Sequence, residues 1–145
     1  MELKIKRLSP DAKIPTYGSA SAAGADLYAL SVKEIEINAG ETLLVHTGIA
    51  MQIPDGYVGL IYARSGLASK RGLAPANKVG VIDCDYRGEV MVALHNHSNE
   101  EQTVARGERI AQLVITPYVT ANFEEVDELS NTERGEGGFG STGTN

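Results

Sequence analysis

Several features that the chain lacks narrow the folds and functions open to it. Its 145 residues include one cysteine, Cys84, so an intrachain disulfide is excluded. No apolar stretch approaches the ~20 residues that a membrane helix needs, and residues 1–6 lack the apolar run of a signal peptide. We therefore expect a cytoplasmic protein with no membrane partner.

The chain also lacks an excess of basic residues. Its 13 lysines and arginines are outnumbered by 19 aspartates and glutamates, which gives a formal net charge of −6 at pH 7. Broad contact with nucleic acid needs a basic surface that neutralises phosphates. We therefore expect no nucleic-acid partner, and any anionic ligand has to be held by a local arrangement of a few residues.

Helical periodicity is nearly missing, and apolar residues instead repeat with a period of two. Ile35 and Ile37 alternate with glutamates, while Val90, Val92 and Leu94 share one face of a predicted strand. Further strands are predicted at residues 3–8, 42–52, 57–64, 79–83 and 109–116. Many short strands separated by turns indicate an all-β antiparallel sandwich, jelly roll or barrel.

The predicted helical content is one short segment, residues 65–71, with Ser65 as its N-cap and Gly72 at its end. A chain of 145 residues that is 42% hydrophobic suits one domain with a substantial core. Towards the C-terminus an acidic run is followed by a glycine-rich stretch that cannot fill a core. We expect a β domain at residues 1–123 and a flexible arm at residues 124–145.

The segment Arg64-Ser65-Gly66 lies where a predicted strand passes directly into the helix. The free amides of a helix start, the Ser65 hydroxyl and the Arg64 guanidinium can together hold phosphate oxygens. Helix capping is the commoner reason for a Ser-Gly pair at such a place. Both interpretations stay open at this point.

Residues 80–88 are predicted to form a hairpin with two carboxylates, Asp83 and Asp85, at its turn. Aspartate before an exposed Arg-Gly pair is ordinary turn chemistry. A carboxylate at the end of a strand also suits a general base that activates water. We assign Asp85 to the turn and Asp83 to chemistry.

The glycine-rich arm carries Arg134, Phe139, Ser141 and Thr142. It is no Walker loop, because the Gly-Lys-Ser/Thr ending is missing. A flexible terminus is the simplest interpretation. A segment that closes over a bound anion would also explain the arginine and the phenylalanine.

Other polar residues give weaker signals. His95 and His97 share a strand face, but zinc needs further ligands at matched spacing, so we predict surface or interface residues. Cys84 has no histidine placed near it by the sequence, which favours an inert thiol. Asp26, taken alone, is a lone carboxylate in a small-residue turn.

Five segments, taken together and in this order, resemble the motifs of the trimeric dUTPases. They are Ala23–Leu27, Arg64–Ala68, Gly80–Glu89, Arg106–Leu113 and Arg134–Gly143. The family hydrolyses dUTP to dUMP and pyrophosphate with Mg²⁺, which limits uracil incorporation into DNA and supplies dUMP for dTMP synthesis. The resemblance implies a jelly-roll-like subunit in a homotrimer whose active sites are built from all three chains.

The resemblance also implies how the base and sugar are bound. Residues Asn77 to Asp83 would bind uracil mainly through the backbone, including that of Gly80 and Ile82, and a thymine methyl would collide with this segment. Tyr86 would pack against the deoxyribose and leave no room for a ribose 2′-hydroxyl. Asp83 would orient and deprotonate the water that attacks the α-phosphorus.

On the phosphate side, the resemblance implies contributions from two further chains. One neighbour would line the phosphates with Arg64, Ser65, Gly66 and Gln112. The other would close over the nucleotide with Arg134, Phe139, Gly140, Ser141 and Thr142. Mg²⁺ would be held mainly by the substrate phosphates, and Asp26 would act on it through metal-bound waters.

Two other functions stay open. A dCTP deaminase-like enzyme would have a similar fold and phosphate site but a glutamate as its acid/base, and the segment at residues 83–88 favours a uracil reader over it. A non-catalytic trimeric nucleotide-binding module would bind nucleotide without releasing pyrophosphate.

Overall fold

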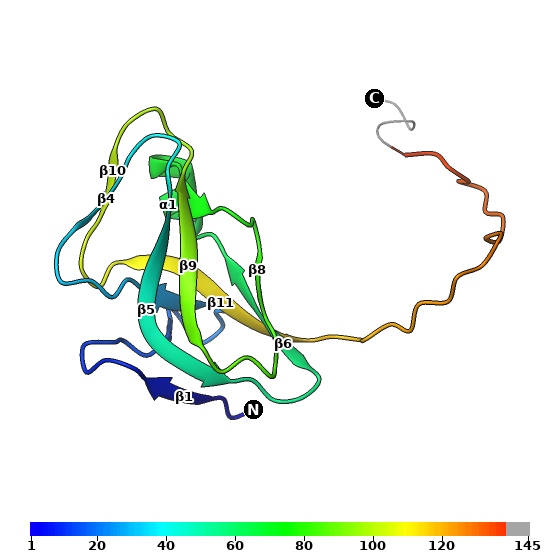
Figure 1. The fold of residues 1–145 in the computed structure, drawn as a ribbon, viewed down its shortest axis with the longest axis horizontal. Helices are drawn as coiled ribbons and strands as arrows, with labels where there is room; N and C mark the ends of the chain where they lie inside the picture. Colours follow the sequence, from blue (N-terminus) through cyan, green and yellow to red (C-terminus); the bar gives the residue numbers. More distant parts are fainter. Residues whose placement is uncertain (139–145) are drawn as a thin grey trace.

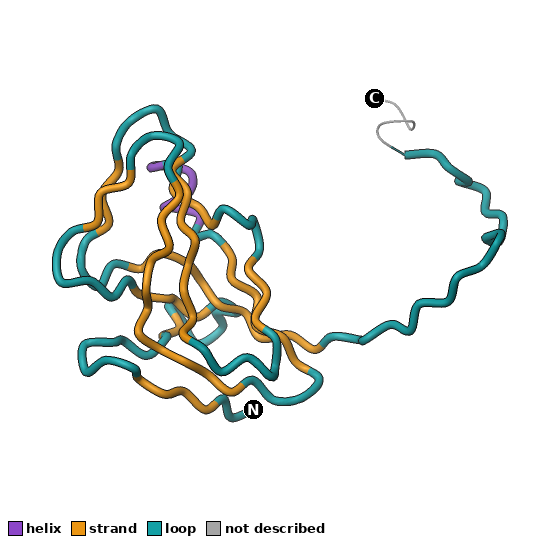
Figure 2. Tube along the Cα trace, viewed as in Figure 1, coloured by secondary structure: helices purple, strands orange, loops and turns teal. Residues whose placement is uncertain are grey.

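Antiparallel strands make up nearly all of the regular structure in this computed structural model, which describes residues 1–138 (Figures 1 and 2). The strands are β1 (Lys4–Arg7), β2 (Thr16–Tyr17), β3 (Ala25–Tyr28), β4 (Ile35–Ile37), β5 (Thr42–Gln52), β6 (Tyr57–Tyr62), β7 (Leu73–Pro75), β8 (Gly80–Ile82), β9 (Glu89–Asn96), β10 (Gln102–Val104) and β11 (Arg109–Pro117). The one helix among the described residues is α1 (Ser65–Arg71). The predicted all-β class with one short helix is confirmed.

Two main sheets enclose the core. One has the strand order β1-β5-β9-β7 and the other the order β2-β3-β11-β6-β8, while β10 and β4 form a small third sheet. Every strand pair is antiparallel. This arrangement is the jelly-roll-like sandwich expected from the sequence.

The period of two decides which side chains enter the core. On β9, the side chains of Val90, Val92 and Leu94 are buried, and those of Met91 and Ala93 are only half-buried. Each fully buried aliphatic side chain stabilises the fold by ~1.5–3 kcal/mol. The strands therefore turn the face that the sequence marks as apolar towards the facing sheet.

The predicted hairpin at residues 80–88 is wrong in one respect. Strand β8 pairs with β6, whereas β9 pairs with β5 and β7, so the two strands belong to different sheets. The connecting loop crosses from one sheet of the sandwich to the other. A local strand-turn-strand pattern does not reveal which strands pair, because the pairing partners come from distant parts of the chain.

The ends of α1 differ in how well the sequence predicted them. Gly72 ends the helix in the left-handed conformation, with φ at 67°, as expected. The N-cap is Arg64 rather than Ser65, and it makes no capping hydrogen bond through its side chain. Because Arg64 keeps the extended backbone of the preceding strand, Ser65 becomes the first helical residue.

The C-terminal arm leaves the sandwich after β11 and runs away from it (Figure 1). The amide of Tyr118 still donates to the carbonyl of Gly56 at 3.1 Å, and residues 118–138 contain neither helix nor strand. Within residues 1–138, no helix has the length and apolar character to cross a membrane.

Candidate active site

A cleft between the two main sheets lies beside β8, and we call it the β8 cleft. It has a volume of about 250 Å³ and is lined by Leu44, Ile61, Asn77, Gly80, Val81, Ile82, Asp83, Tyr86, Glu89, Val90 and Met91. Strand β8 is the edge strand of its sheet, paired with β6 on one side. Its outer backbone groups therefore face the cleft side and can hydrogen-bond a flat ligand as a further strand would.

A tight turn at the start of β8 brings Asn77 to the cleft. The amide of Val79 donates to the carbonyl of Asn77 at 2.7 Å, and Lys78 between them has a positive φ of 66°. A non-glycine residue rarely adopts this conformation, which marks local backbone strain. A Cβ at Gly80 would lie 3.3 Å from the side-chain amide nitrogen of Asn77. Glycine at position 80 therefore leaves space for the Asn77 side chain.

Asp83 and Asp85 lie in one turn but in different surroundings. The amide of Tyr86 donates to the carbonyl of Asp83 at 3.1 Å, which closes a turn with Cys84 and Asp85 at its centre. The turn therefore begins at Asp83 rather than at Asp85. Asp83 lines the β8 cleft and Asp85 is not among the lining residues; the assignment of Asp83 to chemistry stays a prediction.

Tyr86 folds back over the chain at the mouth of the cleft. Its hydroxyl donates to the backbone carbonyl of Glu89 at 3.0 Å. A Cβ at Gly88 would lie 2.3 Å from the Tyr86 hydroxyl oxygen, so a larger residue there would displace the ring. The position of the Tyr86 ring thus depends on Gly88 and Glu89.

Glu89 is a cleft residue that the sequence did not single out. Its carboxylate accepts hydrogen bonds from the Gly48 amide at 2.7 Å and is 2.9 Å from Nδ1 of His46. Burial alone would raise the pKa of Glu89, but the contacts from His46 and from the Gly48 and Thr47 amides together hold it below its usual value. Both partners come from β5, more than 40 residues away, so no local pattern could have revealed them.

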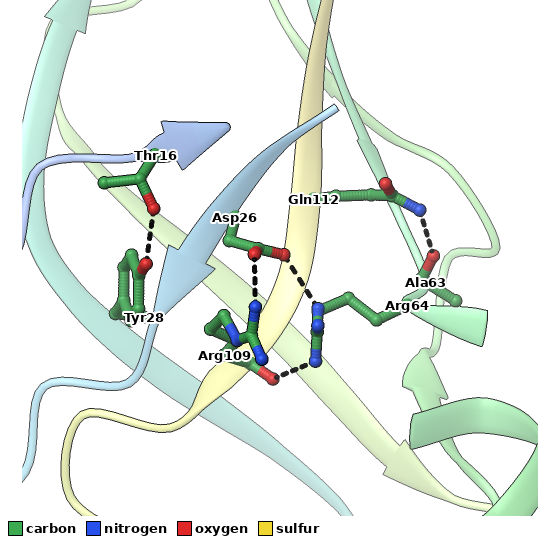
Figure 3. Close-up of polar contacts among 7 residues, drawn as sticks. All are labelled: Thr16, Asp26, Tyr28, Ala63, Arg64, Arg109 and Gln112. Carbon is green, nitrogen blue, oxygen red and sulfur yellow. Dashed lines mark hydrogen bonds and ion pairs between the residues drawn. The ribbon is translucent and has the colours of Figure 1, made fainter. Parts of the chain in front are cut away.

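A second hollow, the arginine cluster, is built around Asp26 on β3 (Figure 3). It has a volume of about 230 Å³ and is lined by Gly18, Ala22, Gly24, Asp26, Arg64, Ser65, Gly66, Arg109 and Gln112. Nε of Arg64 is 2.7 Å from one carboxylate oxygen of Asp26, and a terminal nitrogen of Arg109 is 3.1 Å from the other. The side chain of Asp26 is 12% exposed, against 50% for Arg109.

The structure therefore corrects the picture of Asp26 as a lone carboxylate. It joins the strand end at Arg64 to β11, and it holds two guanidinium groups at one hollow. Positive charges gathered in this way favour a polyanionic ligand. Arg109 was missed as a site residue because its link to Asp26 spans two strands that are distant in the sequence.

Gln112 lies at the same hollow and fixes the strand end that leads into α1. Its side-chain amide donates to the carbonyl of Ala63 at 2.8 Å (Figure 3). A Cβ at Gly24 would lie 2.4 Å from the side-chain oxygen of Gln112. Ser65 and Gly66 are both exposed at the start of α1, and a Cβ at Gly66 would meet open space.

The donor groups at the arginine cluster do not form a metal cage. Across the described part of the chain, no group of three or more His, Cys, Asp or Glu side chains could hold a metal ion. Asp26 supplies the one carboxylate of this hollow, and each of its oxygens already accepts from an arginine. A role of Asp26 towards the water shell of Mg²⁺, an ion that dehydrates reluctantly, stays a prediction.

The weaker candidates lie outside both hollows. The rings of His95 and His97 contact each other edge to face, with centroids 4.3 Å apart. Burial and the nearby charges of Lys78 and His95 lower the pKa of His97. Cys84 is half-buried with its sulfur 3.8 Å from the Tyr118 hydroxyl.

The arm contributes one described site candidate. Nε of Arg134 donates to the carbonyl of Gly137 at 2.7 Å within a local turn. The other arm candidates, Phe139, Gly140, Ser141 and Thr142, lie outside the described residues.

Comparisons with known proteins agree with this geometry. The dUTPase family model matches residues 10–143. The deoxyuridine 5′-triphosphate nucleotidohydrolase of Nautilia profundicola is 53% identical over 143 residues, covering 99% of each chain.

Solved structures lead to the same family. A Staphylococcus bacteriophage 80alpha dUTPase with dUpNHpp has a TM-score of 0.89 at 32% identity and covers 99% of both chains. A mutant dUTPase of phage phi11 of S. aureus, described with a structural Mg(II) ion, has a TM-score of 0.79 at 27% identity and covers 88% of this chain and 98% of its own. The chain thus belongs to the dUTPase family, whose members are deoxyuridine 5′-triphosphate nucleotidohydrolases.

Proposed function

We propose that this chain hydrolyses dUTP to dUMP and pyrophosphate by attack of an Asp83-activated water on the α-phosphorus. The observation that carries the proposal is the pair of separate hollows. One has an edge strand and a carboxylate, and the other has two arginines held by Asp26. A site for a nucleoside triphosphate needs one subsite that recognises the base and another that binds the phosphates.

The β8 cleft would bind uracil through the outer edge of β8 and the side chain of Asn77. Gly80 and Ile82 would contribute backbone groups, and the tight turn at Lys78 would hold Asn77 against the strand. Preformed donors and acceptors discriminate strongly against a base that presents the wrong pattern, because buried polar groups then remain unpaired. Tyr86 at the mouth would contact the deoxyribose and exclude a 2′-hydroxyl.

Asp83 would accept a proton from the attacking water. A new bond forms between the water oxygen and the α-phosphorus, the bond to the bridging oxygen breaks, and the electron pair leaves with pyrophosphate. The carboxylate at the strand end is exposed at the cleft, where a water can reach it. Positioning of this water would contribute a large part of the acceleration.

The arginine cluster would bind the phosphates. Arg64 and Gln112 would contact phosphate oxygens together with the exposed start of α1 at Ser65 and Gly66. Mg²⁺ on the substrate phosphates would neutralise charge on the leaving pyrophosphate, and Asp26 would contact its water shell. A relative from phage phi11 is described with a structural Mg(II) ion, which supports Mg²⁺ as a ligand in this family; its position at the phosphates is part of the proposal.

The two hollows share no lining residue, which supports a shared site assembled by a homotrimer. One copy would supply the β8 cleft and a second the arginine cluster. The arm at residues 124–145 of a third would close over the nucleotide, with Arg134, Ser141 and Thr142 at the phosphates and Phe139 on the uracil. An arm that runs away from its own domain has the form needed to reach another copy (Figure 1).

Pyrophosphate release measured with dUTP, dTTP, dCTP and UTP in the presence of Mg²⁺ tests the proposal. Release from dUTP alone is the expected result. Ammonia from dCTP would support the deaminase alternative, and tight binding of dUTP without pyrophosphate would support a binding module. Either outcome would overturn the proposed reaction.

A further inference from the structure

We propose that Glu89 is a specificity-determining positioning residue, whose carboxylate holds Tyr86 at the sugar subsite by anchoring the start of β9 to β5. The role rests on the proposed function, because it assumes that Tyr86 contacts the deoxyribose. Glu89 itself does not touch the reacting atoms in this proposal.

The start of β9 has few ladder partners in the sheet, although the buried Thr47 hydroxyl of β5 donates to the carbonyl of Val90. Strands β5 and β9 pair in continuous register from Thr42 opposite His95 to His46 opposite Met91. The register then shifts, and Ala50 opposite Glu89 is the one remaining pair of this ladder. An irregularity of this kind leaves backbone groups without ladder partners and bends the strand.

The Glu89 carboxylate lies at that irregularity and joins its two sides. One oxygen accepts from the Gly48 amide at 2.7 Å, and the other contacts the His46 ring at 2.9 Å. Gly48 has a positive φ of 70°, and a Cβ there would lie 2.5 Å from Leu30, so this position of the bulge requires glycine. A charged acceptor on a backbone amide is among the stronger hydrogen bonds in proteins.

The same residue positions Tyr86 through its backbone. The Tyr86 hydroxyl donates to the carbonyl of Glu89 at 3.0 Å, and Gly88 leaves room for the ring. In this proposal the contacts of the Glu89 carboxylate hold the backbone of Glu89 in place, and the Tyr86 hydroxyl binds to the carbonyl of that same residue. Loss of the carboxylate should therefore shift the Tyr86 ring. Tyr86 is 44% exposed, so the hydroxyl contact and the close approach of the ring to Gly88 hold the ring in place.

The test compares hydrolysis of dUTP and UTP by Glu89→Ala and Glu89→Gln. The readout is the ratio of the two kcat/KM values. Glu89→Ala should lower the ratio roughly tenfold, the equivalent of about one charge-assisted hydrogen bond. Glu89→Gln should keep most of the ratio, because its amide oxygen can still accept from Gly48. Exposed Glu101→Gln is the matched control and should leave the ratio unchanged.

A double-mutant cycle separates this role from general loosening of the fold. Tyr86→Phe removes the hydroxyl and should lower the ratio by a similar factor, and adding Glu89→Ala to it should cause little further loss. Independent, multiplying losses would contradict a link through the hydroxyl, and a wild-type ratio in Glu89→Ala would overturn the proposal.

If Glu89→Ala fails to fold, Gly88→Ala provides a second route. It displaces the Tyr86 ring while leaving the carboxylate intact, and it should lower the dUTP to UTP ratio. An unchanged ratio in Gly88→Ala would overturn the role of the tyrosine position. If the wild-type protein does not hydrolyse dUTP, both the proposed function and this role of Glu89 are disproved. If the wild type hydrolyses dUTP but the variants keep its dUTP to UTP ratio of kcat/KM, this role alone is disproved.

Discussion

The β8 cleft and the arginine cluster are held in shape by different means. The cleft is bounded by an edge strand, a strained turn at Lys78 and glycines that admit close neighbours. The cluster is held by ionic contacts from Asp26 to Arg64 and Arg109. Backbone geometry suits the recognition of one base, whereas guanidinium groups, each with several donors, suit a polyanion.

The difference predicts that variants in the two regions fail in different ways. Changes at the cleft should affect turnover and the choice of base or sugar. Changes at the cluster should affect affinity for the triphosphate while leaving the base preference intact. Five experiments test this contrast, and the largest effect is expected at Asp83, the carboxylate of the cleft.

Asp83→Asn should reduce turnover by on the order of 10²- to 10⁴-fold, the usual contribution of a positioned base. Nucleotide affinity should persist, because the amide keeps the shape of the side chain. Pyrophosphate release and equilibrium binding of dUTP measure the two quantities separately. Asp85→Asn, in the same turn but outside the cleft, is the control and should turn over normally. Retention of most of the rate in Asp83→Asn would disprove the base assignment.

Truncation after Glu133 should leave a folded protein whose turnover falls on the order of 10²-fold, since a poorly closed site misplaces the reacting groups. The arm would then be what completes both regions around one nucleotide. Circular dichroism, light scattering and steady-state rates test this. Removal of residues 144–145 alone is the control. Dissociation of the truncated protein into monomers would instead give the arm a structural role.

Arg64→Ala should weaken dUTP binding by about 10–100-fold, because a charge-assisted contact to phosphate contributes ~1.5–3 kcal/mol. Binding of deoxyuridine, which has no phosphate, should change little. Isothermal titration with both ligands provides the comparison, and Arg7→Ala on the exposed strand β1 is the control. Equal losses for both ligands would mean that the two regions are not separable.

Gly24→Ala should weaken triphosphate binding by about tenfold, because overpacking displaces the Gln112 side chain at a cost of ~1–3 kcal/mol. A Cβ at this position lies 2.4 Å from the side-chain oxygen of Gln112. The loss should shrink in a Gln112→Ala background, because the closest contacts, to the side-chain oxygen and Cδ of Gln112, are removed and a 3.2 Å approach to Cβ remains. If Gly24→Ala causes the full loss of binding in the Gln112→Ala background as well, the effect arises from the backbone at Gly24 and not from contact with Gln112.

The smallest effect concerns the pH dependence of stability. Because the pKa of Glu89 is lowered from its usual value of 4.5 in the folded protein, the stability that this carboxylate contributes is present above pH 4.5. It is lost as the pH falls through the lowered pKa, since the unfolded chain then binds the proton more readily. Thermal melts between pH 7 and pH 3 should show a steeper acid decline for wild type than for Glu89→Gln. Parallel curves would contradict the assigned contacts.

The local sequence predicted most of the fold. Alternation on Val90, Val92 and Leu94 gives β9 its buried face, and Gly72 marks the end of α1 by its left-handed backbone. Strand β5 has the predicted bounds, residues 42–52. These features depend on neighbours within a few residues, which is why a pattern can reveal them.

The site was predictable in its parts but not in its connections. Asn77, Asp83 and Tyr86 were predicted as site residues from the resemblance to a known family, and they line one cleft; their roles stay predictions. Arg109 and Glu89 were not, because their partners Asp26 and His46 lie on other strands.

Local sequence was enough to specify an acidic β domain, the order of its motifs and the identity of the groups available for chemistry. The packing of the whole chain decided that β8 and β9 enter different sheets, that Asp26 contacts two arginines and that the Tyr86 hydroxyl donates to the carbonyl of Glu89. The reason is physical: side-chain periodicity is set by local backbone geometry, whereas strand pairing and charge contacts depend on segments brought together only when the core is packed.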